Sequence, residues 1–254
     1  MRLLLDLGNT RLKWALMQPS AAEWLARGAL DWHDDMPGLL QEAWAALPVP
    51  TSIVAASVVG AEREAQVTSL VAQRFGCEPR WFRTPASACG IHNAYADPQR
   101  LGADRFLAMV AAFAEGHAPC VLASVGTALT LDALAADGRH LGGLIAPGPR
   151  LMQQSLLNGT ARVRPDGVGV ILELADNTTD AVSSGCWQAT VALTERFSVR
   201  MGPRLGGSPR LILDGGDAPT LAPLLSIPSH SGRDGVMRGL AVWAHPPSVV
   251  TRSG

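Results

Sequence analysis

Residues 3–16 read LLLDLGNTRLKWAL, and residues 121–134 read VLASVGTALTLDAL. Each stretch has an apolar run typical of a strand, then a small turn containing Gly and Thr, then a second apolar run. Because Gly tolerates the backbone angles of a tight turn, each stretch predicts a β-hairpin. The wide separation of the two copies is typical of a duplicated domain rather than of a short-period repeat.

Strand and helix patterns alternate on both sides of the second hairpin, which is typical of α/β layers. We place the boundary between an N-terminal half, 1–117, and a C-terminal half, 118–254, where AEGHAP interrupts a helical pattern. The expected strands are 2–6, 11–17, 52–59, a short one within 79–85, the hairpin 121–134 and one within 209–218; the expected helices are 62–76, 102–116, 176–201 and 233–244, while 140–161 combines a strand, a Gly/Pro turn and a helix.

The composition excludes several classes of protein. The chain has 254 residues, of which 47% are hydrophobic and 17% charged, as in a globular protein with a sizeable core. A formal net charge of −1 predicts no nucleic-acid or anionic-membrane partner. No signal peptide or membrane helix is recognisable, and the four widely spaced cysteines are expected to be reduced thiols. We therefore expect a cytoplasmic protein.

The glycine turns could bind phosphate groups. Backbone N–H groups at such a turn can approach an anion closely, and a Thr hydroxyl adds a donor. Two turns facing each other across a cleft could hold a nucleotide, with Asp6 at a strand end holding Mg²⁺ directly or through water. A third turn, DGGDA at 214–218, could accommodate a nucleoside. The P-loop and dinucleotide-binding motifs are absent, and a single Gly-Asn hairpin is usually only structural, so both interpretations stay open.

Asp104 is the candidate catalytic residue, because it falls in the first turn of a predicted helix. A carboxylate there commonly does no more than complement the helix dipole. In a phosphotransferase it could instead accept a hydrogen bond from the attacking hydroxyl and align it, which suits a reaction governed by positioning and charge neutralisation. Arg105 offers a planar donor fork for a substrate carboxylate. Tyr95, in the polar loop upstream, is either a surface or packing residue or part of this site.

Six motifs in order carry a resemblance to a known family: DLGNTRLKWAL, YADPQRLGADR, GTALTLD, GGLIAPGPRLM, NTTDAVSSG and LDGGDA. The set spans nearly the whole chain and resembles the type III pantothenate kinases, a family that includes Bvg accessory factor-type proteins. The resemblance implies a duplicated actin-like fold, of the acetate and sugar kinase, Hsp70 and actin type, with two halves around a nucleotide cleft. It also implies ATP-dependent phosphorylation of pantothenate to 4′-phosphopantothenate in coenzyme A biosynthesis, by a homodimer.

The resemblance assigns roles to individual residues. Asp104 is implied as the proton acceptor, Thr127 as a second ATP contact, and Thr178 as a substrate contact that could reach across a dimer. The implied first ATP loop consists of Asp6, Leu7, Gly8, Asn9, Thr10, Arg11, Leu12 and Lys13; the implied pantothenate contacts are Tyr95, Gly102, Ala103, Asp104, Arg105 and Thr178. ATP would be used with Mg²⁺.

Ser124 departs from the family pattern, which typically has Asp there to hold a monovalent cation, K⁺ or NH₄⁺. Hard cations favour carboxylate and carbonyl oxygens, so the exchange to Ser is expected to weaken or remove this ligand. Asp132, eight positions on, matches the family's downstream acid, and a polar strand-end role is an equal alternative for it.

Two other functions remain open from the sequence. One is a non-catalytic regulatory or accessory protein on the same nucleotide-binding scaffold, which the exchange at Ser124 favours. The other is a kinase of the same fold acting on another hydroxyl compound such as a sugar, which the combination of Tyr95 with the GADR motif at 102–105 disfavours.

Overall fold

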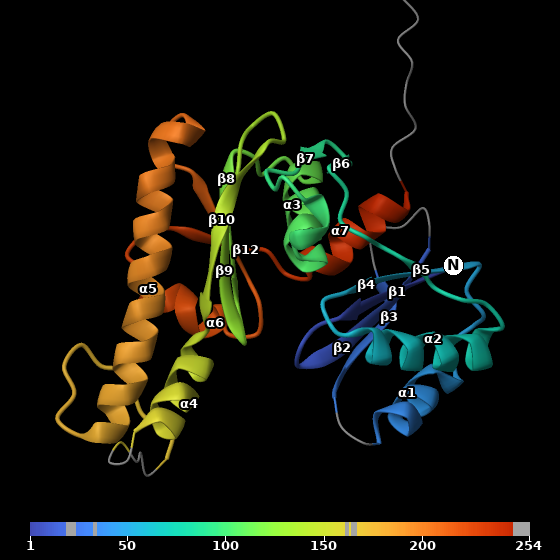
Figure 1. The fold of residues 1–254 in the computed structure, drawn as a ribbon, viewed down its shortest axis with the longest axis horizontal. Helices are drawn as coiled ribbons and strands as arrows, with labels where there is room; N and C mark the ends of the chain where they lie inside the picture. The colour runs from blue at the N-terminus through green and yellow to red at the C-terminus, as the bar shows by residue number, and fades with distance from the viewer. Residues whose placement is uncertain (19–23, 33–34, 161–162, 164–166, 246–254) are drawn as a thin grey trace, which may run out of the picture. The chain divides into compact units, whose positions relative to one another are not determined.

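The computed structural model describes residues 1–18, 24–32, 35–160, 163 and 167–245 (Figure 1). The chain forms two compact units. Unit 1 contains Met1–Glu115 and the segment that begins at Asp234, and unit 2 is Gly116–Arg233. In the part of the chain that the structure describes, no helix is both long and apolar enough to cross a membrane.

Unit 1 is built on a five-stranded sheet with the order β3-β2-β1-β4-β5. The strands β1 and β2 form the first predicted hairpin, and β4 and β5 add in parallel on the other side of β1. Leu3, Leu5 and Leu7 alternate along β1 and enter one apolar core. The strand bounds are β1 Arg2–Leu7, β2 Arg11–Met17, β3 Trp24–Asp31, β4 Ser52–Ser57 and β5 Arg80–Trp81.

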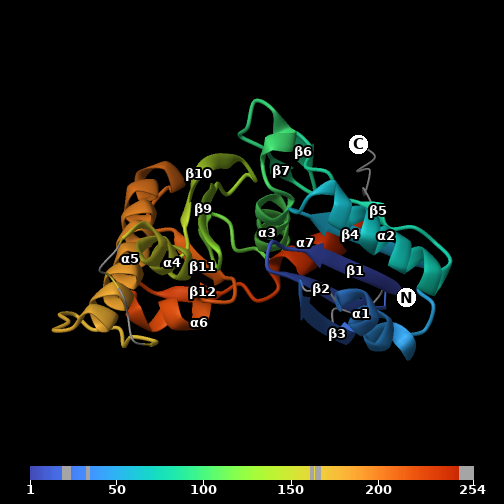
Figure 2. The same cartoon turned by 60° about the horizontal axis from the view of Figure 1, so that its bottom comes forward.

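Helices cover both faces of the unit 1 sheet (Figures 1 and 2). The core face is covered by α1 (Met36–Ala45) and α2 (Ala61–Phe75), and α2 ends as predicted at Gly76, whose φ is 72°. The opposite face receives α3 (Ala103–Ala114) and α7 (Gly235–Ala244), which pack against each other and against β4. Before α3, the chain forms a small hairpin of β6 (Ser87–Ala88) and β7 (Ile91–His92) and the 3₁₀ turn η1 (Pro98–Arg100).

The last helix, α7, lies in a different unit from the one expected. The predicted division at 117/118 assigned it to the C-terminal half. By its contacts α7 belongs to unit 1, where it packs on α3. Gly239 permits this packing, because a Cβ there would lie 1.9 Å from the carbonyl oxygen of Leu107. The physical reason is that an apolar helix joins the face that buries it, whichever half of the sequence it follows.

Unit 2 repeats the arrangement, with the sheet order β10-β9-β8-β11-β12. In both sheets the first two neighbouring pairs are antiparallel and the last two are parallel, so the topology of the two sheets is the same. This identity confirms the predicted duplication of an α/β unit. The strand bounds are β8 Cys120–Val125, β9 Ala128–Leu134, β10 His140–Pro147, β11 Arg210–Asp214 and β12 Ser229–Ser231.

One face of the unit 2 sheet forms a second apolar core under α5 and α6 (Figure 2). The long helix α5 runs over Thr178–Leu205 and ends at Gly206, beyond the predicted end at 201. The other helices are α4 (Pro149–Gly159), α6 (Ala218–Leu221) and the 3₁₀ turn η2 (Ala222–Leu224). The four cysteines are free thiols, and burial raises the pKa of Cys120 to about 12.

Candidate functional site

The carboxyl ends of β1, β4 and β5 meet at one edge of the unit 1 sheet, because these strands are parallel. The segments that leave this edge lie side by side. The amide of Val58 donates to the carbonyl of Leu7 over 3.0 Å, and the amide of Phe82 donates to the carbonyl of Ala55 over 2.6 Å. Ligands of open α/β sheets bind outside such an edge, so this is where the candidate site of unit 1 is expected.

The first glycine turn, residues 8–10, begins at this edge and is held from outside the hairpin. Trp32 Nε1 donates to the Gly8 carbonyl over 2.7 Å, and the Trp32 amide donates to the Thr10 carbonyl over 3.1 Å. Arg63, in the first turn of α2, lies 4.7 Å above the Trp32 ring and reaches the Asn9 carbonyl at 3.4 Å. Sequence reasoning missed Trp32 and Arg63, because they approach the turn only through tertiary contacts.

Asp6 and Lys13 are direct partners across the β1–β2 pair, on the sheet face opposite the apolar core. Asp6 is 7% exposed and Lys13 is half-buried. Leu7 and Leu12, which the predicted ATP loop also included, are fully buried in the core, so only their backbone groups can contact a ligand. Arg11 is exposed and forms an ion pair with Asp31 at 3.3 Å.

The beginning of α3 brings together the predicted substrate residues of unit 1. Gly102 is the N-cap residue of the helix, and a Cβ there would lie 2.4 Å from Asp104 Oδ1. The same carboxylate oxygen accepts a hydrogen bond of 2.8 Å from the Arg105 amide. Ala103 is buried, while the Asp104 side chain stays half-buried. Glycine at 102 thus leaves room for this carboxylate to fold back onto its own helix end.

Buried Arg105 and half-buried Tyr95 form a polar pair beside this helix end. Arg105 is 6% exposed, its Nη1 donates to the Tyr95 hydroxyl over 3.0 Å, and its guanidinium lies 5.8 Å from the Tyr95 ring centre. Asn93 fixes the loop that carries Tyr95: its side chain accepts from the Tyr95 amide at 3.0 Å and donates to the carbonyls of Pro85 and Pro98. The structure therefore brings Tyr95 into contact with the GADR motif through Arg105.

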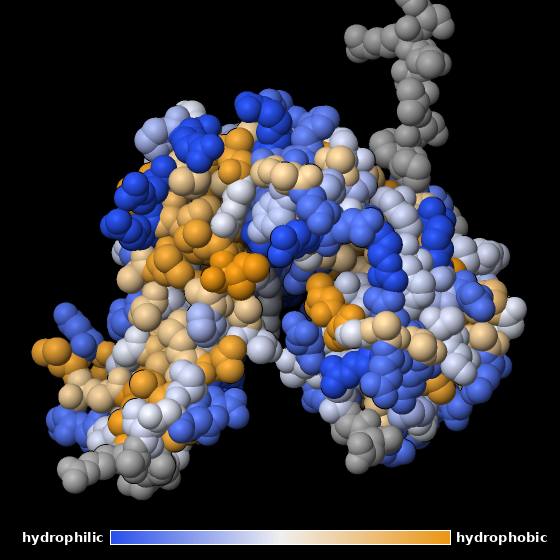
Figure 3. Space-filling view, in the orientation of Figure 1, coloured by the Kyte–Doolittle hydropathy of each residue, from blue (hydrophilic) through white to orange (hydrophobic). Residues whose placement is uncertain are grey.

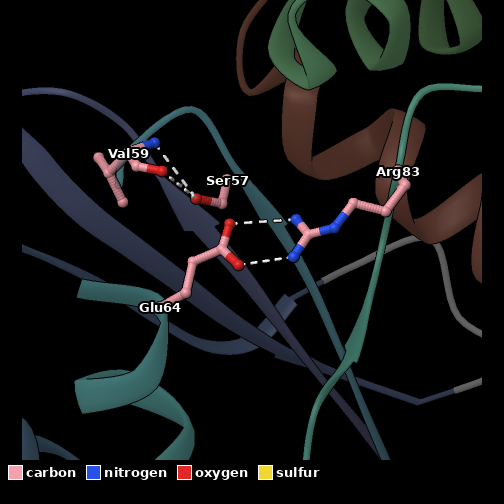
Figure 4. A network of polar contacts seen from close by, with 4 residues as sticks. All are labelled: Ser57, Val59, Glu64 and Arg83. Atoms are coloured by element: carbon pink, nitrogen blue, oxygen red, sulfur yellow. Dashed lines mark hydrogen bonds and ion pairs between the residues drawn. The ribbon is translucent and has the colours of Figure 1, made fainter. Parts of the chain in front are cut away.

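A polar cavity of about 400 Å³ lies between the strand ends and the beginning of α3. Its lining comes from 57–59, 82–84 and 99–103. Arg83 in this lining holds Glu64 of α2 through both guanidinium nitrogens, with Nη1 to Oε1 at 3.0 Å (Figure 4). Burial raises the pKa of Glu64, but the hydrogen bonds from Arg83 and Ser57 outweigh it, so the pKa lies below its usual value. The carboxylate is therefore ionised and keeps Arg83 in place.

The second glycine turn, 125–127, is packed against two other glycine turns within unit 2. A Cβ at Gly148 would lie 1.9 Å from the Gly126 carbonyl oxygen, and one at Gly215 would lie 2.2 Å from the Val125 carbonyl oxygen. The Gly148 amide also donates to the Thr127 carbonyl over 2.9 Å. Thr127 itself is exposed. The turns of the motifs GTALTLD, APGP and LDGGDA thus pack against one another through their backbones.

Two acidic residues of unit 2 have partners that the sequence did not predict. Asp217 is 6% exposed and accepts from Arg150 Nε at 2.8 Å, which ties the third turn to the beginning of α4. Asp132 Oδ1 lies 2.9 Å from His140 Nε2, and both side chains are buried. Asp132 on β9 and His140 on β10 thus form a buried polar pair between the two strands.

Thr178 is the first residue of α5 and is exposed. Asn177 caps the helix by accepting from the Asp180 amide at 3.0 Å. Hydrogen bonds from the Asn177 side chain and the Val170 amide hold the pKa of Asp180 below its usual value. The cap at Asn177 fixes the first turn of α5, which begins at Thr178.

Comparison of the sequence with known proteins identifies relatives of one family. A family model described as type III pantothenate kinase matches residues 2–200. A type III pantothenate kinase from Laribacter hongkongensis is 43% identical and aligned over 95% of this chain and 97% of its own. Another, from Xanthomonas campestris pv. campestris, is 41% identical over 95% of this chain and 96% of its own.

Solved structures resemble the fold. A Campylobacter jejuni protein, named as a conserved Baf family transcriptional activator, has a TM-score of 0.57 at 19% identity, over 96% of this chain and 98% of its own. A Sinorhizobium meliloti protein named as a 2-dehydro-3-deoxygalactonokinase has a TM-score of 0.55 at 18% identity over the full length of both chains. With the repeated sheet topology, these neighbours confirm the predicted duplicated actin-like fold.

Proposed function

We propose, on the premise that this chain belongs to the type III pantothenate kinase family, that Asp104 accepts the proton of the pantothenate hydroxyl during phosphoryl transfer from ATP. The enzyme phosphorylates pantothenate in coenzyme A biosynthesis. The observation that carries the assignment is the half-buried Asp104 carboxylate at the beginning of α3, next to the Arg105–Tyr95 pair.

The surroundings of Asp104 suit alignment of the hydroxyl more than strong proton abstraction. The Arg105 amide and the positive end of the α3 dipole both favour the ionised carboxylate. An ionised carboxylate can accept a hydrogen bond from the attacking hydroxyl and take its proton as the new P–O bond forms. Phosphoryl transfer tolerates such a weak base, because positioning and charge neutralisation supply most of the rate enhancement.

Arg105 is proposed to bind the carboxylate of pantothenate. Its guanidinium is planar, and its hydrogen bond to the Tyr95 hydroxyl restricts how the fork is oriented. Tyr95, Gly102 and Ala103 are proposed as further pantothenate contacts, since they surround Arg105 and Asp104 along the loop and helix end. In unit 2, Thr178 is a proposed substrate contact because the α5 end leaves it exposed.

The glycine turns are proposed to bind ATP. In unit 1 the contacts would come from residues 6–13, chiefly the backbone N–H groups of 8–10 and the side chain of Lys13. In unit 2 the contact would come from Thr127. Asp6 fits a role toward Mg²⁺, because its oxygen ligands suit that hard cation and it lies next to the turn. Bound Mg²⁺ would neutralise charge on the ATP phosphates.

We also propose a homodimer. Apolar side chains are exposed on unit 2, and Figure 3 shows apolar surface where this unit carries α4, α5 and β10. The small residues Ala181, Gly185 and Ala189 form an exposed stripe on α5 that would allow close helix packing. Among the residues of unit 2 that the structure describes, the exposed large apolar side chains are Leu144, Ile145, Leu151, Leu156, Val168, Val170, Leu172, Leu174 and Val199. Membership in a family of metabolic enzymes supports a cytoplasmic location.

The test is phosphoryl transfer by the purified chain with Mg²⁺, ATP and pantothenate in a K⁺ buffer. We expect phosphopantothenate from the wild type, and a kcat lower by at least about 100-fold in Asp104→Asn. Glu62→Gln is the matched control, because Glu62 is an exposed acid in the first turn of α2. Absence of product from the wild type in either K⁺ or NH₄⁺ would instead support the non-catalytic alternative.

A further inference from the structure

Three oxygen-bearing side chains lie in one line across the unit 2 sheet. Ser124 on β8 has Asp214 as its direct partner on β11 and Thr130 as its direct partner on β9. Directly paired residues of neighbouring strands project from the same face of a sheet. The line therefore contains one carboxylate and two hydroxyls, contributed by three strands.

The face that carries this line is opposite the apolar core of unit 2. The core takes the alternate residues, Ala123 on β8, Leu131 on β9 and Leu213 on β11. Ser124 is exposed, and Thr130 and Asp214 are half-buried. The line also lies at the end of β8 and β11, immediately before the turns that contain Gly126 and Gly215. It is thus close in the chain to Thr127, the proposed ATP contact of unit 2.

The oxygen atoms of Ser124, Thr130 and Asp214 indicate which kind of ion could bind between them. Carboxylate and hydroxyl oxygens are ligands for hard cations, and one carboxylate supplies one negative charge. Among the residues that the structure describes, no group of three or more His, Cys, Asp and Glu side chains could hold a metal ion. A single negative charge with two neutral oxygens balances the charge of a monovalent cation, whereas Mg²⁺ is bound by one or two carboxylates together with substrate phosphates.

We propose that Asp214 supplies, from β11, the carboxylate for a monovalent cation, K⁺ or NH₄⁺, at the position where β8 has Ser124. The inference rests on the proposed kinase function and on the monovalent cation that the family resemblance implies, and it assigns the charged ligand to a different strand. Neighbouring strands lie about 4.8 Å apart, so a carboxylate on β11 can reach a cation beside the Ser124 hydroxyl. The negative charge that the family pattern has at position 124 would thereby be supplied by a neighbouring residue of the same line.

The backbone around Asp214 keeps its carboxylate in a defined position. The Gly215 amide donates to Asp214 Oδ1 over 2.7 Å. Gly215 has a φ of 96° and lies tightly against the Val125 backbone, so the turn after Asp214 has little room to move. A carboxylate held in this way loses little side-chain freedom when it binds a cation.

The experiment measures cation binding by thermal melting, apart from catalysis. The full chain is melted in KCl and in N-methylglucamine chloride at equal ionic strength, with and without ADP. We expect a K⁺-specific rise in Tm for the wild type, because a ligand of the folded state stabilises it. In Asp214→Asn the K⁺ concentration at half-maximal effect should rise about tenfold or more, since the charged ligand is lost. Asp137→Asn is the control, because Asp137 is an exposed unit 2 carboxylate.

The double variant Ser124→Asp/Asp214→Asn returns the carboxylate to β8 and should restore a K⁺ response close to that of the wild type. This variant also separates loss of the ligand from loss of folding. Absence of a K⁺-specific shift in the wild type, or an unchanged shift in Asp214→Asn, overturns the proposal. Pantothenate phosphorylation is measured in parallel. A K⁺ shift that depends on Asp214 without any kinase activity would refute the proposed function and leave the cation site standing.

Discussion

Arg105 combines a structural role with the proposed role in substrate binding. The residue is 6% exposed, and a buried charge destabilises the fold unless hydrogen bonds compensate for it. The Tyr95 hydroxyl and ring provide part of this compensation. Under the proposed function, the carboxylate of pantothenate would place an opposite charge beside this guanidinium. Lysine at 105 would lack both the planar fork and the contact with the ring.

At the same scale, the Glu64–Arg83 pair predicts a pH dependence of stability. Glu64 has a folded-state pKa below the ordinary 4.5, so its contribution is fully present above 4.5 and is lost as the pH falls through the folded-state value. Glu64→Gln should therefore destabilise the protein by about 1 kcal/mol at pH 7, and by progressively less below pH 4.5. Thermal melting of both proteins from pH 7 downward measures the difference.

Glu62→Gln serves as the control for Glu64→Gln, since Glu62 occupies the same first turn of α2 but is exposed. A destabilisation by Glu64→Gln that stays constant through the acid range would show that the pair does not act through ionisation of Glu64.

At the scale of elements, the two hairpins are equivalent in the sheets but differ in what surrounds their turns. The turn after β1 is held by the side chains of Trp32 and Arg63. The turn after β8 is held by backbone contacts with the turns at Gly148 and Gly215. Side-chain support tolerates small substitutions, whereas backbone packing leaves no room for a Cβ. Gly148 and Gly215 are therefore expected to be less replaceable than Gly8, whose Cβ would lie 3.3 Å from the Arg11 carbonyl oxygen.

This difference predicts that Gly148→Ala destabilises the protein by about 2–3 kcal/mol, because the added Cβ meets the Gly126 carbonyl and neither backbone can move aside easily. The substitution should also raise the KM for ATP, since it displaces the turn that carries Thr127. Gly159→Ala in α4 is the matched control: nothing lies within 4 Å of its Cβ, and alanine favours helix. Urea unfolding gives the stability and steady-state kinetics the KM. Equal stabilities of the two variants would contradict the packing described here.

At the scale of the whole molecule, the chain builds one sheet topology twice and then returns to its first unit. The helix α7 follows unit 2 in the sequence but packs on α3 and on the sheet of unit 1. Phe82 and Trp243 meet edge to face with ring centres 5.2 Å apart, which adds an aromatic contact to this packing. Unit 1 is therefore complete only after the segment from Asp234 has been made.

A chain that ends at Arg233 should consequently lose protection in unit 1. We expect faster amide hydrogen exchange in β1, β4 and α3, because the face that α7 buries becomes exposed. Unit 2 should keep its protection, which makes it the internal control. Adding a peptide of residues 234–245 should restore part of the protection of unit 1. Unchanged exchange in β1 and α3 of the shortened chain would contradict this account.

Local patterns predicted much of the fold. The hairpins at 3–16 and 121–134, the helix ending at Gly76 and the helix beginning at Gly102 all form as expected, because alternation, glycine turns and helix periodicity act over short distances. The strand β3 and the helix α1 were not predicted. Their residues join the core through partners on β2 and α2, so the local pattern alone is a weak signal.

The sequence by itself determined that two Gly/Thr turns and the GADR motif would occur, and which chemistry these residue types can perform. Only the tertiary structure decided that Trp32 supports Gly8 and that Asp214 stands beside Ser124. Side-chain chemistry and turn geometry belong to a few consecutive residues. Neighbours across a sheet, in contrast, depend on strand order and register, which arise when distant segments bury their apolar faces together.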